Sequence, residues 1–221
     1  MFNVCPGCGL YSVEKAIDPS GPFAICPSCG HRHLFVRLPL FVVTGASGAG
    51  KTTVSLQLPN LLSECVVLES DLLWRPELDR PENQYRDFRD LWLRLAKNVH
   101  QSGRSVVLLG SAVPESFENS PERRYLRVIH YLALVCDDGA LATRLSQRPG
   151  WRNSHSDDFV KRMVAFNRWL REHADTTTPP LTLLETIEAT IEETVGQVAR
   201  WVRQGGMNAN RCNSTDNCLY C

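Results

Sequence analysis

Two features are missing from this 221-residue sequence: an excess of charge of either sign and a long apolar run. The 24 acidic side chains balance the 24 basic ones, so the chain carries no overall field that would attract nucleic acid or an anionic membrane. No apolar stretch approaches the roughly 20 residues that a helix needs to cross a bilayer. A Cys-Pro pair occupies the place where a signal peptide would have its apolar segment, which argues against secretion. We therefore expect a cytoplasmic protein with no membrane partner.

Cysteine, in contrast, is plentiful, and its spacing indicates a metal site. Nine cysteines without a secretion signal favour reduced thiols and metal ligation over a disulfide framework. Two Cys-x-x-Cys-Gly turns are spaced as in Cys₄ zinc sites, and each turn offers two thiolates to one ion. The four expected Zn²⁺ ligands are Cys5, Cys8, Cys26 and Cys29.

Residues 1–36, which contain these turns, resemble a zinc ribbon. The expected strands of this unit lie at 10–17 and 23–25 and pair across a turn at 18–21. The unit is too small for a core of its own, so we expect Zn²⁺ to fold it. His31 and His33 follow the second cysteine turn, and we interpret them as surface groups because four thiolates already complete a tetrahedral site.

The strongest pattern is the Gly-x-x-x-x-Gly-Lys-Thr run that follows the apolar stretch at 40–43. A strand, a glycine-rich turn and a helix make a phosphate-binding loop, in which backbone N–H groups surround phosphate oxygens where no Cβ intrudes. Lys51 is expected to reach the β- and γ-phosphates of ATP, and the Thr52 hydroxyl to hold Mg²⁺. The residues assigned to the nucleotide here are Gly45, Ala46, Ser47, Gly48, Ala49, Gly50, Lys51, Thr52 and Thr53.

From residue 38 onward, short apolar runs alternate with helical patterns, as in a parallel α/β sheet. The expected strands lie at 40–43, 66–68, 106–109, 131–135 and 181–184. Apolar stripes with helical spacing occur over 85–99, 159–170 and 191–202, and we interpret them as core. A capping box at 190–193 predicts the start of the last helix.

The end of the chain, after Gln204, is polar, and we expect a mobile tail there. It contains the remaining clustered cysteines, Cys212, Cys218 and Cys221. Metal binding by these three is an open alternative, but no histidine lies nearby to complete a site. The expected units are a zinc ribbon at 1–36, a P-loop domain at 37–204 and the tail at 205–221.

Two acids end the second expected strand, and ligands of open α/β sheets lie at the carboxyl ends of strands. Glu69 and Asp71 are two residues apart, so their side chains point the same way. We expect Asp71 to orient or deprotonate the acceptor, and Glu69 to lie nearer Mg²⁺ or its waters. The alternative for Asp71 is the N-cap of a helical turn at 72–74.

Three arginines follow the fourth expected strand. Arg144 and Arg148 lie one helical turn apart, and Arg152 lies in a glycine-containing segment that could close over the site. Their guanidinium groups could neutralise charge on a transferred phosphoryl group. We assign Arg148 and Arg152 to ATP, and Arg144 and Arg148 to catalysis together with Lys51 and Asp71. The alternative is a solvated basic helix end.

The segment 71–85 is expected to form the acceptor pocket. Trp74 could stack on a base, or it could belong to the core. The residues assigned to the acceptor are Glu69, Asp71, Trp74 and Arg86. The pattern selects no base, sugar or antibiotic, because such specificity depends on pocket shape.

Residues 38–204 resemble the small P-loop kinases in four respects: the phosphate loop, the Glu69-Ser-Asp71 strand end, the Arg144-x-x-x-Arg148 pair and the final strand-turn-helix. That group includes nucleoside monophosphate kinases, shikimate and gluconate kinases, and chloramphenicol phosphotransferases. The resemblance implies a P-loop NTPase three-layer sandwich with a five-stranded parallel sheet, ATP as donor, Mg²⁺, and lid arginines on the phosphates. The acid pair is similar to the acids that hold metal and acceptor hydroxyl in shikimate-kinase-like members.

The favoured function is therefore an ATP-dependent phosphotransferase that moves the γ-phosphoryl group to a small acceptor, above all a nucleotide or nucleoside. The alternative is an ATP-binding module or switch whose zinc ribbon contacts RNA or a protein partner. RNA is disfavoured because the sequence pI is about 7.0 and no basic strip with interleaved aromatic residues occurs. ADP production that rises with a small acceptor, rather than with a macromolecule, would discriminate between the two functions.

Overall fold

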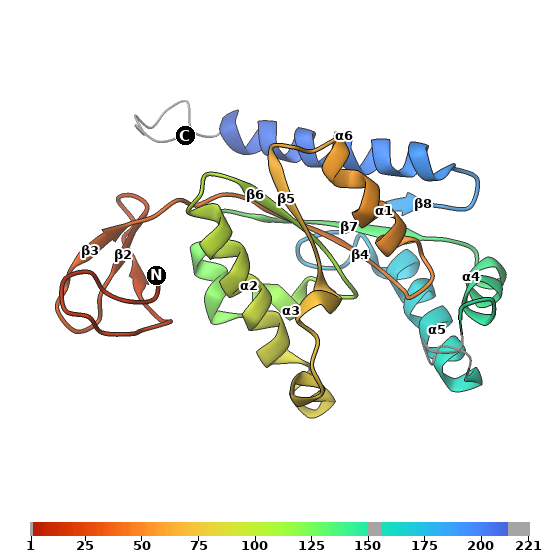
Figure 1. The fold of residues 1–221 in the computed structure, drawn as a ribbon, viewed down its shortest axis with the longest axis horizontal. Coiled ribbons are helices and arrows are strands. Elements are labelled where there is room, and N and C mark those ends of the chain that lie inside the picture. Colours follow the sequence, from red (N-terminus) through yellow and green to blue (C-terminus); the bar gives the residue numbers. More distant parts are fainter. Residues whose placement is uncertain (1, 150–155, 212–221) are drawn as a thin grey trace.

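The computed structural model describes residues 2–149 and 156–211, with side chains up to residue 207 (Figure 1). Arg152 and the three tail cysteines, Cys212, Cys218 and Cys221, lie outside these residues. Within the described part, no helix is both long and apolar enough to cross a membrane.

A five-stranded parallel sheet forms the centre of the larger domain, which confirms the expected fold class. The order across the sheet is β5, β6, β4, β7 and β8, so β4 lies in the middle. These strands are β4 (Leu40–Gly45), β5 (Cys65–Glu69), β6 (Ser105–Leu109), β7 (Ile129–Val135) and β8 (Thr182–Glu185). Because all five run the same way, the phosphate loop after β4 and the acids after β5 lie at one edge of the sheet.

Helices cover both faces of the sheet and complete a three-layer sandwich (Figure 1). One face carries α1 (Lys51–Gln57), the short 3₁₀ turn η1 (Leu58–Asn60) and α6 (Ile191–Arg211). The other face carries α2 (Arg86–His100), α3 (Glu115–Glu118) and α5 (Asp157–His173), and α4 (Asp138–Ser146) packs against α5. Alternation along β4 separates the two layers, because Phe41 and Val43 pack with α6 whereas Leu40 and Val42 pack with α2.

The connection from β5 to α2 is made of three 3₁₀ turns. They are η2 (Ser70–Leu73), η3 (Pro76–Leu78) and η4 (Pro81–Asn83). Proline occupies the first position of η3 and of η4, where its missing N–H costs no hydrogen bond. This connection carries the segment in which the sequence predicts an acceptor pocket.

Local signals explain where α6 begins and how closely it lies on the sheet. Thr190 and Glu193 form the predicted capping box: Glu193 Oε2 accepts from the Thr190 N–H at 2.8 Å, and Thr190 Oγ1 accepts from the Glu193 N–H at 3.2 Å. The helix then continues through Gly205, where a Cβ would lie 2.7 Å from the Phe41 ring. The tail expected to begin at residue 205 is therefore helical as far as Arg211, because glycine here permits close packing and does not end the helix.

The N-terminal unit is a small three-stranded antiparallel sheet. β1 (Ala16–Ile17) pairs with β2 (Phe23–Ile25) across the expected turn. β3 (Arg32–Leu34) pairs with the other side of β2 and is not indicated by the sequence, which lacks an apolar alternation there. His31 is exposed, as predicted, whereas His33 is half-buried with its ring 5.2 Å from that of Phe2.

The larger domain completes the apolar core of this N-terminal unit. Phe2, Ala24 and Phe35 pack with Tyr125, which ends the 3₁₀ helix η5 (Pro121–Tyr125) of the larger domain. The Phe2 and Tyr125 rings meet edge to face, with centroids 5.0 Å apart. The unit is therefore packed onto the larger domain beside α2.

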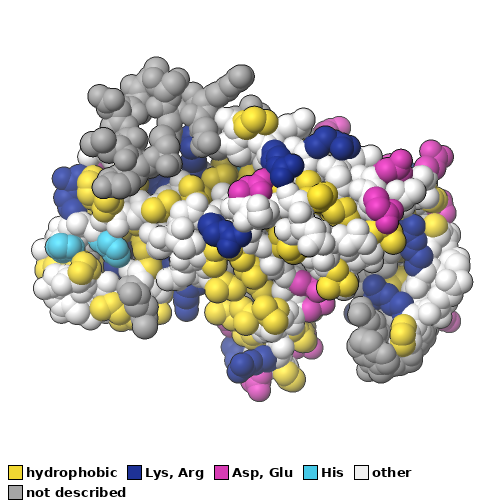
Figure 2. All heavy atoms as spheres, turned by 45° about the horizontal axis from the view of Figure 1, so that its top comes forward, with side chains coloured by type: hydrophobic (Ala, Val, Ile, Leu, Met, Phe, Trp, Pro, Cys, Tyr) yellow, Lys and Arg dark blue, Asp and Glu magenta, His cyan; other side chains and the backbone are white. Residues whose placement is uncertain are grey.

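Charge is distributed without a dominant sign over the face seen in Figure 2. Basic and acidic side chains are interspersed there among apolar ones, in agreement with the balanced composition. That face offers no broad basic field of the kind that dominates nucleic-acid binding.

Candidate active site

The phosphate loop follows β4 directly and requires glycine at two positions. Gly45 approaches β7 so closely that a Cβ would lie 2.6 Å from the Leu134 carbonyl oxygen. Gly48 has a φ of +92°, and a Cβ there would lie 3.0 Å from the Leu141 side chain. A larger residue at either position would strain the backbone or push its neighbours apart. No Cβ atom therefore covers the loop backbone at these positions, as phosphate binding by backbone N–H groups requires.

Lys51 begins α1 and turns its side chain back over the loop. Its ammonium group donates to the carbonyl oxygens of Gly45 at 2.7 Å and Ala46 at 3.0 Å. The half-buried side chain keeps its ammonium among protein atoms, and this burial lowers the Lys51 pKa to about 8, against the opposing charge of Asp71. A cation so poorly solvated interacts strongly with an anionic phosphate.

Thr52 and Glu69 bring two oxygen atoms together from different elements, the start of α1 and the end of β5. The Thr52 hydroxyl donates to Glu69 Oε1 at 2.5 Å. Hydroxyl and carboxylate oxygens are hard ligands of the kind that Mg²⁺ prefers, and Mg²⁺ commonly keeps several waters beside one or two protein ligands. The pair therefore fits a Mg²⁺ site next to the phosphate loop.

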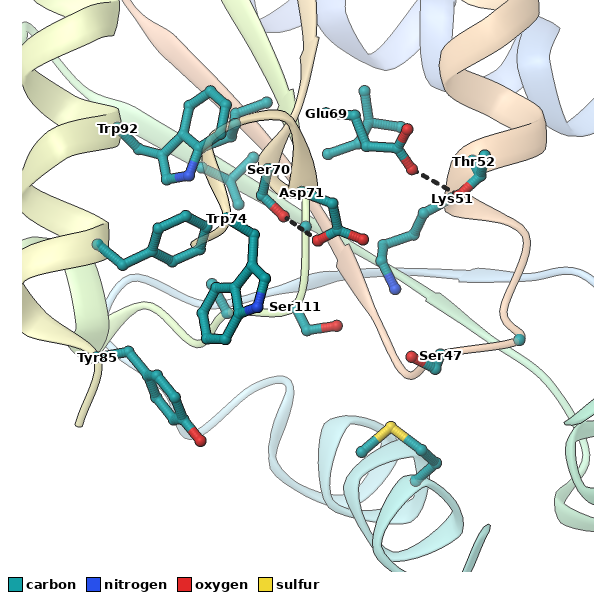
Figure 3. Close-up of a pocket in the computed structure, with 18 of the residues that line it drawn as sticks. Ser47, Lys51, Thr52, Glu69, Ser70, Asp71, Trp74, Tyr85, Trp92 and Ser111 are labelled. Atoms are coloured by element: carbon teal, nitrogen blue, oxygen red, sulfur yellow. Dashed lines mark hydrogen bonds between the residues drawn. The ribbon is translucent and has the colours of Figure 1, made fainter. Parts of the chain in front are cut away.

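Asp71 faces Lys51 from the other side of the same cavity. Figure 3 shows its carboxylate between Trp74 and Lys51, and the Ser70 hydroxyl donates to Asp71 Oδ1 at 3.3 Å. Gly110, after β6, makes room for Ser70, because a Cβ there would lie 2.4 Å from Ser70 Oγ. No side-chain cap forms at the start of η2, and Asp71 lies inside its first turn. The exposed carboxylate is thus available to a ligand and does not act as a helix cap.

A cavity of about 960 Å³ joins the phosphate loop to a group of aromatic rings. The loop side is lined by Ser47, Gly48, Gly50, Lys51, Thr52 and Thr53. The opposite side is lined by Trp74, Tyr85, Phe88 and Trp92, which we call the aromatic wall. Asp71 lies where the two sides meet (Figure 3). The volume is in the upper part of the range found for small-molecule sites.

Arg144 and Arg148 both line this cavity. The Arg144 guanidinium donates to the Thr186 carbonyl at 3.2 Å and to the Thr186 hydroxyl at 3.4 Å. It is thereby held at the border of a second cavity of about 280 Å³, beside the start of α6. Arg148 lies near enough to Lys51 for its positive charge to lower the Lys51 pKa. Arg144 thus borders both cavities, whereas Arg148 lines the larger one near Lys51.

Comparison with known proteins identifies the family. A family model described as an AAA domain matches residues 42–160, which is more than half of the chain. The chain belongs to this AAA domain family. No curated protein matches it.

Two solved structures share the fold of this AAA domain protein. One is a sugar kinase from Janibacter sp. HTCC2649, with a TM-score of 0.58 and 17% sequence identity over 76% of this chain and 95% of that one. The other is a gluconokinase from Sinorhizobium meliloti 1021, with a TM-score of 0.53 and 20% identity over 77% of this chain and 94% of that one. At this level of identity the similarity establishes the fold.

The AAA domain brings most of the predicted site residues to one cavity, but Gly45, Ala46, Ala49 and Arg86 do not line it. Arg86 begins α2 with an exposed side chain that does not line the cavity. Arg89, one turn further along the helix, does line it, as does Trp92. Sequence reasoning missed Arg89. Its interpretation of Trp92 as core is confirmed, because the side chain is 2% exposed and packs in the core, and the same side chain also borders the cavity. Their signal is the helical spacing of Arg89 and Trp92, which lie three residues apart on one face of α2.

The four predicted zinc ligands lie ahead of the AAA domain and come together. Their sulfur atoms all lie within 4.8 Å of one another, and the Cys5–Cys29 and Cys8–Cys26 pairs are each 3.7 Å apart. A tetrahedral ion with Zn–S bonds of about 2.3 Å needs sulfur atoms about 3.8 Å apart. Backbone N–H groups of Cys29 and Ser28 lower the pKa of the Cys26 thiol, which favours a thiolate. The cluster therefore fits Zn²⁺.

Proposed function

We propose that this AAA domain protein is an ATP-dependent phosphotransferase that moves the γ-phosphoryl group of ATP to a small acceptor, with a nucleotide or nucleoside as the favoured class. The observation that carries the proposal is that Lys51, the Thr52–Glu69 pair and Asp71 line one cavity. Similar folds in proteins described as a sugar kinase and a gluconokinase support the same type of reaction. Because a fold hosts many activities, the proposal depends on the site.

Lys51 and the loop N–H groups hold the phosphates of ATP in this proposal. The hydrogen bonds from Lys51 to two loop carbonyls are exchanged for bonds to phosphate oxygens when ATP binds. The smaller cavity, bordered by Arg144 and Thr186, is our candidate for the adenine of ATP. Arg148 adds a second positive charge near the phosphates.

In the transfer step, the acceptor hydroxyl oxygen forms a bond to the γ-phosphorus while the bond from that phosphorus to the β–γ bridging oxygen breaks, and ADP leaves. Asp71 orients the hydroxyl and takes its proton as the new bond forms. Lys51 and Arg148 stabilise the negative charge that develops on the transferred group. Thr52 and Glu69 would hold Mg²⁺, and the ion would supply positive charge to the phosphate oxygens.

For the N-terminal unit we propose a structural Zn²⁺ held by four thiolates, Cys5, Cys8, Cys26 and Cys29. Such a closed site has no open position for a substrate, so the ion supplies folding free energy and no chemistry. Tyr125 of the AAA domain packs into the apolar core of the N-terminal unit.

The test is ADP release by the purified protein with ATP, Mg²⁺ and a pool of nucleosides, nucleoside monophosphates and sugar acids. We expect the pool to raise ADP release above the acceptor-free rate, and Lys51→Ala to abolish the increase. Lys161→Ala, at an exposed lysine of α5, is the matched control and should behave as the wild type. An increase with RNA or protein in place of the pool would favour the ATP-dependent binding module.

A further inference from the structure

We infer that the acceptor is a nucleoside, and that Arg89 and Trp92 of α2 recognise its base. This inference rests on the proposed phosphotransferase function and narrows its acceptor. It excludes two other acceptor classes: polyhydroxylated sugar acids, and nucleoside monophosphates, whose accepting group is a phosphate.

The aromatic wall is continuous and suits a planar ring. Trp74 and Phe88 meet edge to face at 5.1 Å, and Phe88 meets Trp92 in the same way at 6.1 Å. Tyr85 lies 6.0 Å from Trp74, so the four rings adjoin one another along the cavity. A nucleobase would contact these rings through its apolar faces. A sugar acid would instead bury several hydroxyl groups against rings that offer few hydrogen-bond partners.

Trp92 provides a hydrogen-bond donor that the protein leaves unused. The side chain is 2% exposed, and its Nε1–H has no hydrogen-bond partner among the described residues. Figure 3 shows this nitrogen turned toward the part of the cavity where Trp74 lies. A buried N–H without a partner is costly, so a ligand that accepts this hydrogen bond gains free energy that an apolar ligand would not.

Arg89 provides further donors on the same wall. Its guanidinium packs over the Tyr85 ring at 5.9 Å, and no carboxylate of the described residues pairs with it. Burial lowers the Arg89 pKa, as expected for a cation held away from water without a counter-charge. Guanidinium N–H groups pair with carbonyl and ring-nitrogen acceptors of bases. Arg89 and Trp92 therefore favour a ring whose edge presents such acceptors.

Asp71 distinguishes a nucleoside from a nucleotide. Its carboxylate lies beside Lys51, at the place where the accepting group must meet the γ-phosphate. A neutral hydroxyl can donate its proton there, which makes it a better nucleophile. A phosphate acceptor would bring a second negative charge against the carboxylate, which is unfavourable in a partly desolvated cavity. A nucleoside matches both ends of the cavity, because its sugar hydroxyl can donate to Asp71 while its base contacts the aromatic wall.

The experiment measures kcat and KM for individual acceptors at saturating ATP and Mg²⁺: five common nucleosides, their monophosphates, gluconate and shikimate. We expect at least one nucleoside to have the highest kcat/KM. Trp92→Phe keeps a ring but removes the N–H, and Arg89→Gln removes the charge. Each should raise the KM for that nucleoside by about tenfold, the loss of one good hydrogen bond, while the KM for ATP stays unchanged.

Trp201→Phe, on α6 and outside the cavity, is the matched tryptophan control and should leave both KM values unchanged. Thermal midpoints of all variants establish that they are folded. A monophosphate or sugar acid with the highest kcat/KM would overturn the inference and leave the proposed function standing. Absence of stimulation by any acceptor would overturn the inference too. In that case a thermal shift by ATP and Mg²⁺ that Lys51→Ala abolishes would favour the ATP-binding module, and the lack of such a shift would overturn the nucleotide site as well.

Discussion

The hydroxyl group of Tyr125 joins the two units of the chain: it accepts a hydrogen bond from the Lys15 N–H at 2.8 Å and donates one to the Val13 carbonyl at 2.6 Å. The same contact region contains a buried ion pair, in which Lys97 of α2 donates to Glu122 at 2.5 Å. The N-terminal unit is thus held against the helix that carries Arg89 and Trp92.

Tyr125→Phe tests this junction with the removal of one oxygen atom. The substitution leaves a buried N–H of Lys15 without its partner, so we expect the free energy of unfolding to fall by about 1–3 kcal/mol. Urea denaturation measures the change. Tyr11→Phe, at a tyrosine that is 54% exposed, removes only a longer hydrogen bond of 3.3 Å from Asn3, so this comparison variant should cost less. Equal stability of the two variants would mean that the Tyr125 hydroxyl does not hold the units together.

Zinc content tests the N-terminal cluster. We expect about one Zn²⁺ per chain in protein purified without chelator, and loss of the ion in Cys8→Ser, because three thiolates hold zinc much more weakly than four. Elemental analysis measures the content, and the thermal midpoint should fall together with it. Cys136→Ser, at a buried cysteine outside the cluster, should retain the ion. Metal-free wild-type protein would contradict the zinc assignment.

Features encoded by short local patterns could be predicted from the sequence. The phosphate loop, the five strands and the convergence of the four cysteines each follow from residues that are close together or regularly spaced. In the aromatic wall, Trp74 could be assigned to the acceptor, whereas the rings that α2 contributes could not be predicted in the same way. A stripe that contains Tyr85 and Trp92 has the same spacing whether it faces a core or a cavity.

The rotation of α2 about its axis determines that Arg89, and not Arg86, lines the cavity. Gln84 and Tyr85 both adopt left-handed backbone conformations, with φ of 56° and 58°, immediately before the helix begins at Arg86. Neither residue type favours that conformation, so the sequence carries no sign of it. The turn points Arg89 into the cavity and leaves Arg86 outside.

Lys51 should make ATP binding depend on pH. Its pKa is about 8 in the ligand-free site, so the ammonium is charged below that pH and progressively neutral above it. Phosphates bind the charged form and raise its pKa in the complex. We therefore expect the affinity for ATP and Mg²⁺ to be constant from pH 6.5 to about 7.5 and to fall above about pH 8. Calorimetric titration across this range measures it.

Lys51→Arg is the control for this pH dependence, because a guanidinium stays charged throughout the range. Its affinity for ATP should be lower or equal at neutral pH but independent of pH. If the wild type showed no decline above pH 8, or if the arginine variant declined equally, Lys51 would not be the titrating group.

Asp71→Asn tests the proposed role in proton transfer. Asparagine keeps the size and the hydrogen bond to Ser70 but cannot take a proton from an acceptor hydroxyl. We expect turnover to fall by about 10²–10⁴-fold, the usual contribution of a general base, while the affinity for ATP and Mg²⁺ changes little. Asp175→Asn, at an exposed aspartate after α5, is the matched control and should keep wild-type turnover.

Glu69→Gln completes the comparison because Glu69 and Asp71 are expected to fail in different ways. Glu69 shares a hydrogen bond with Thr52, so its loss should weaken Mg²⁺ and raise the concentration needed for half-maximal turnover. Asp71→Asn should leave that concentration unchanged and slow the reaction at every Mg²⁺ concentration. If Asp71→Asn instead weakened Mg²⁺ and Glu69→Gln slowed the saturated rate, the two roles would have to be exchanged. Unchanged turnover in Asp71→Asn would exclude Asp71 as the general base, because asparagine cannot accept the proton of the acceptor hydroxyl.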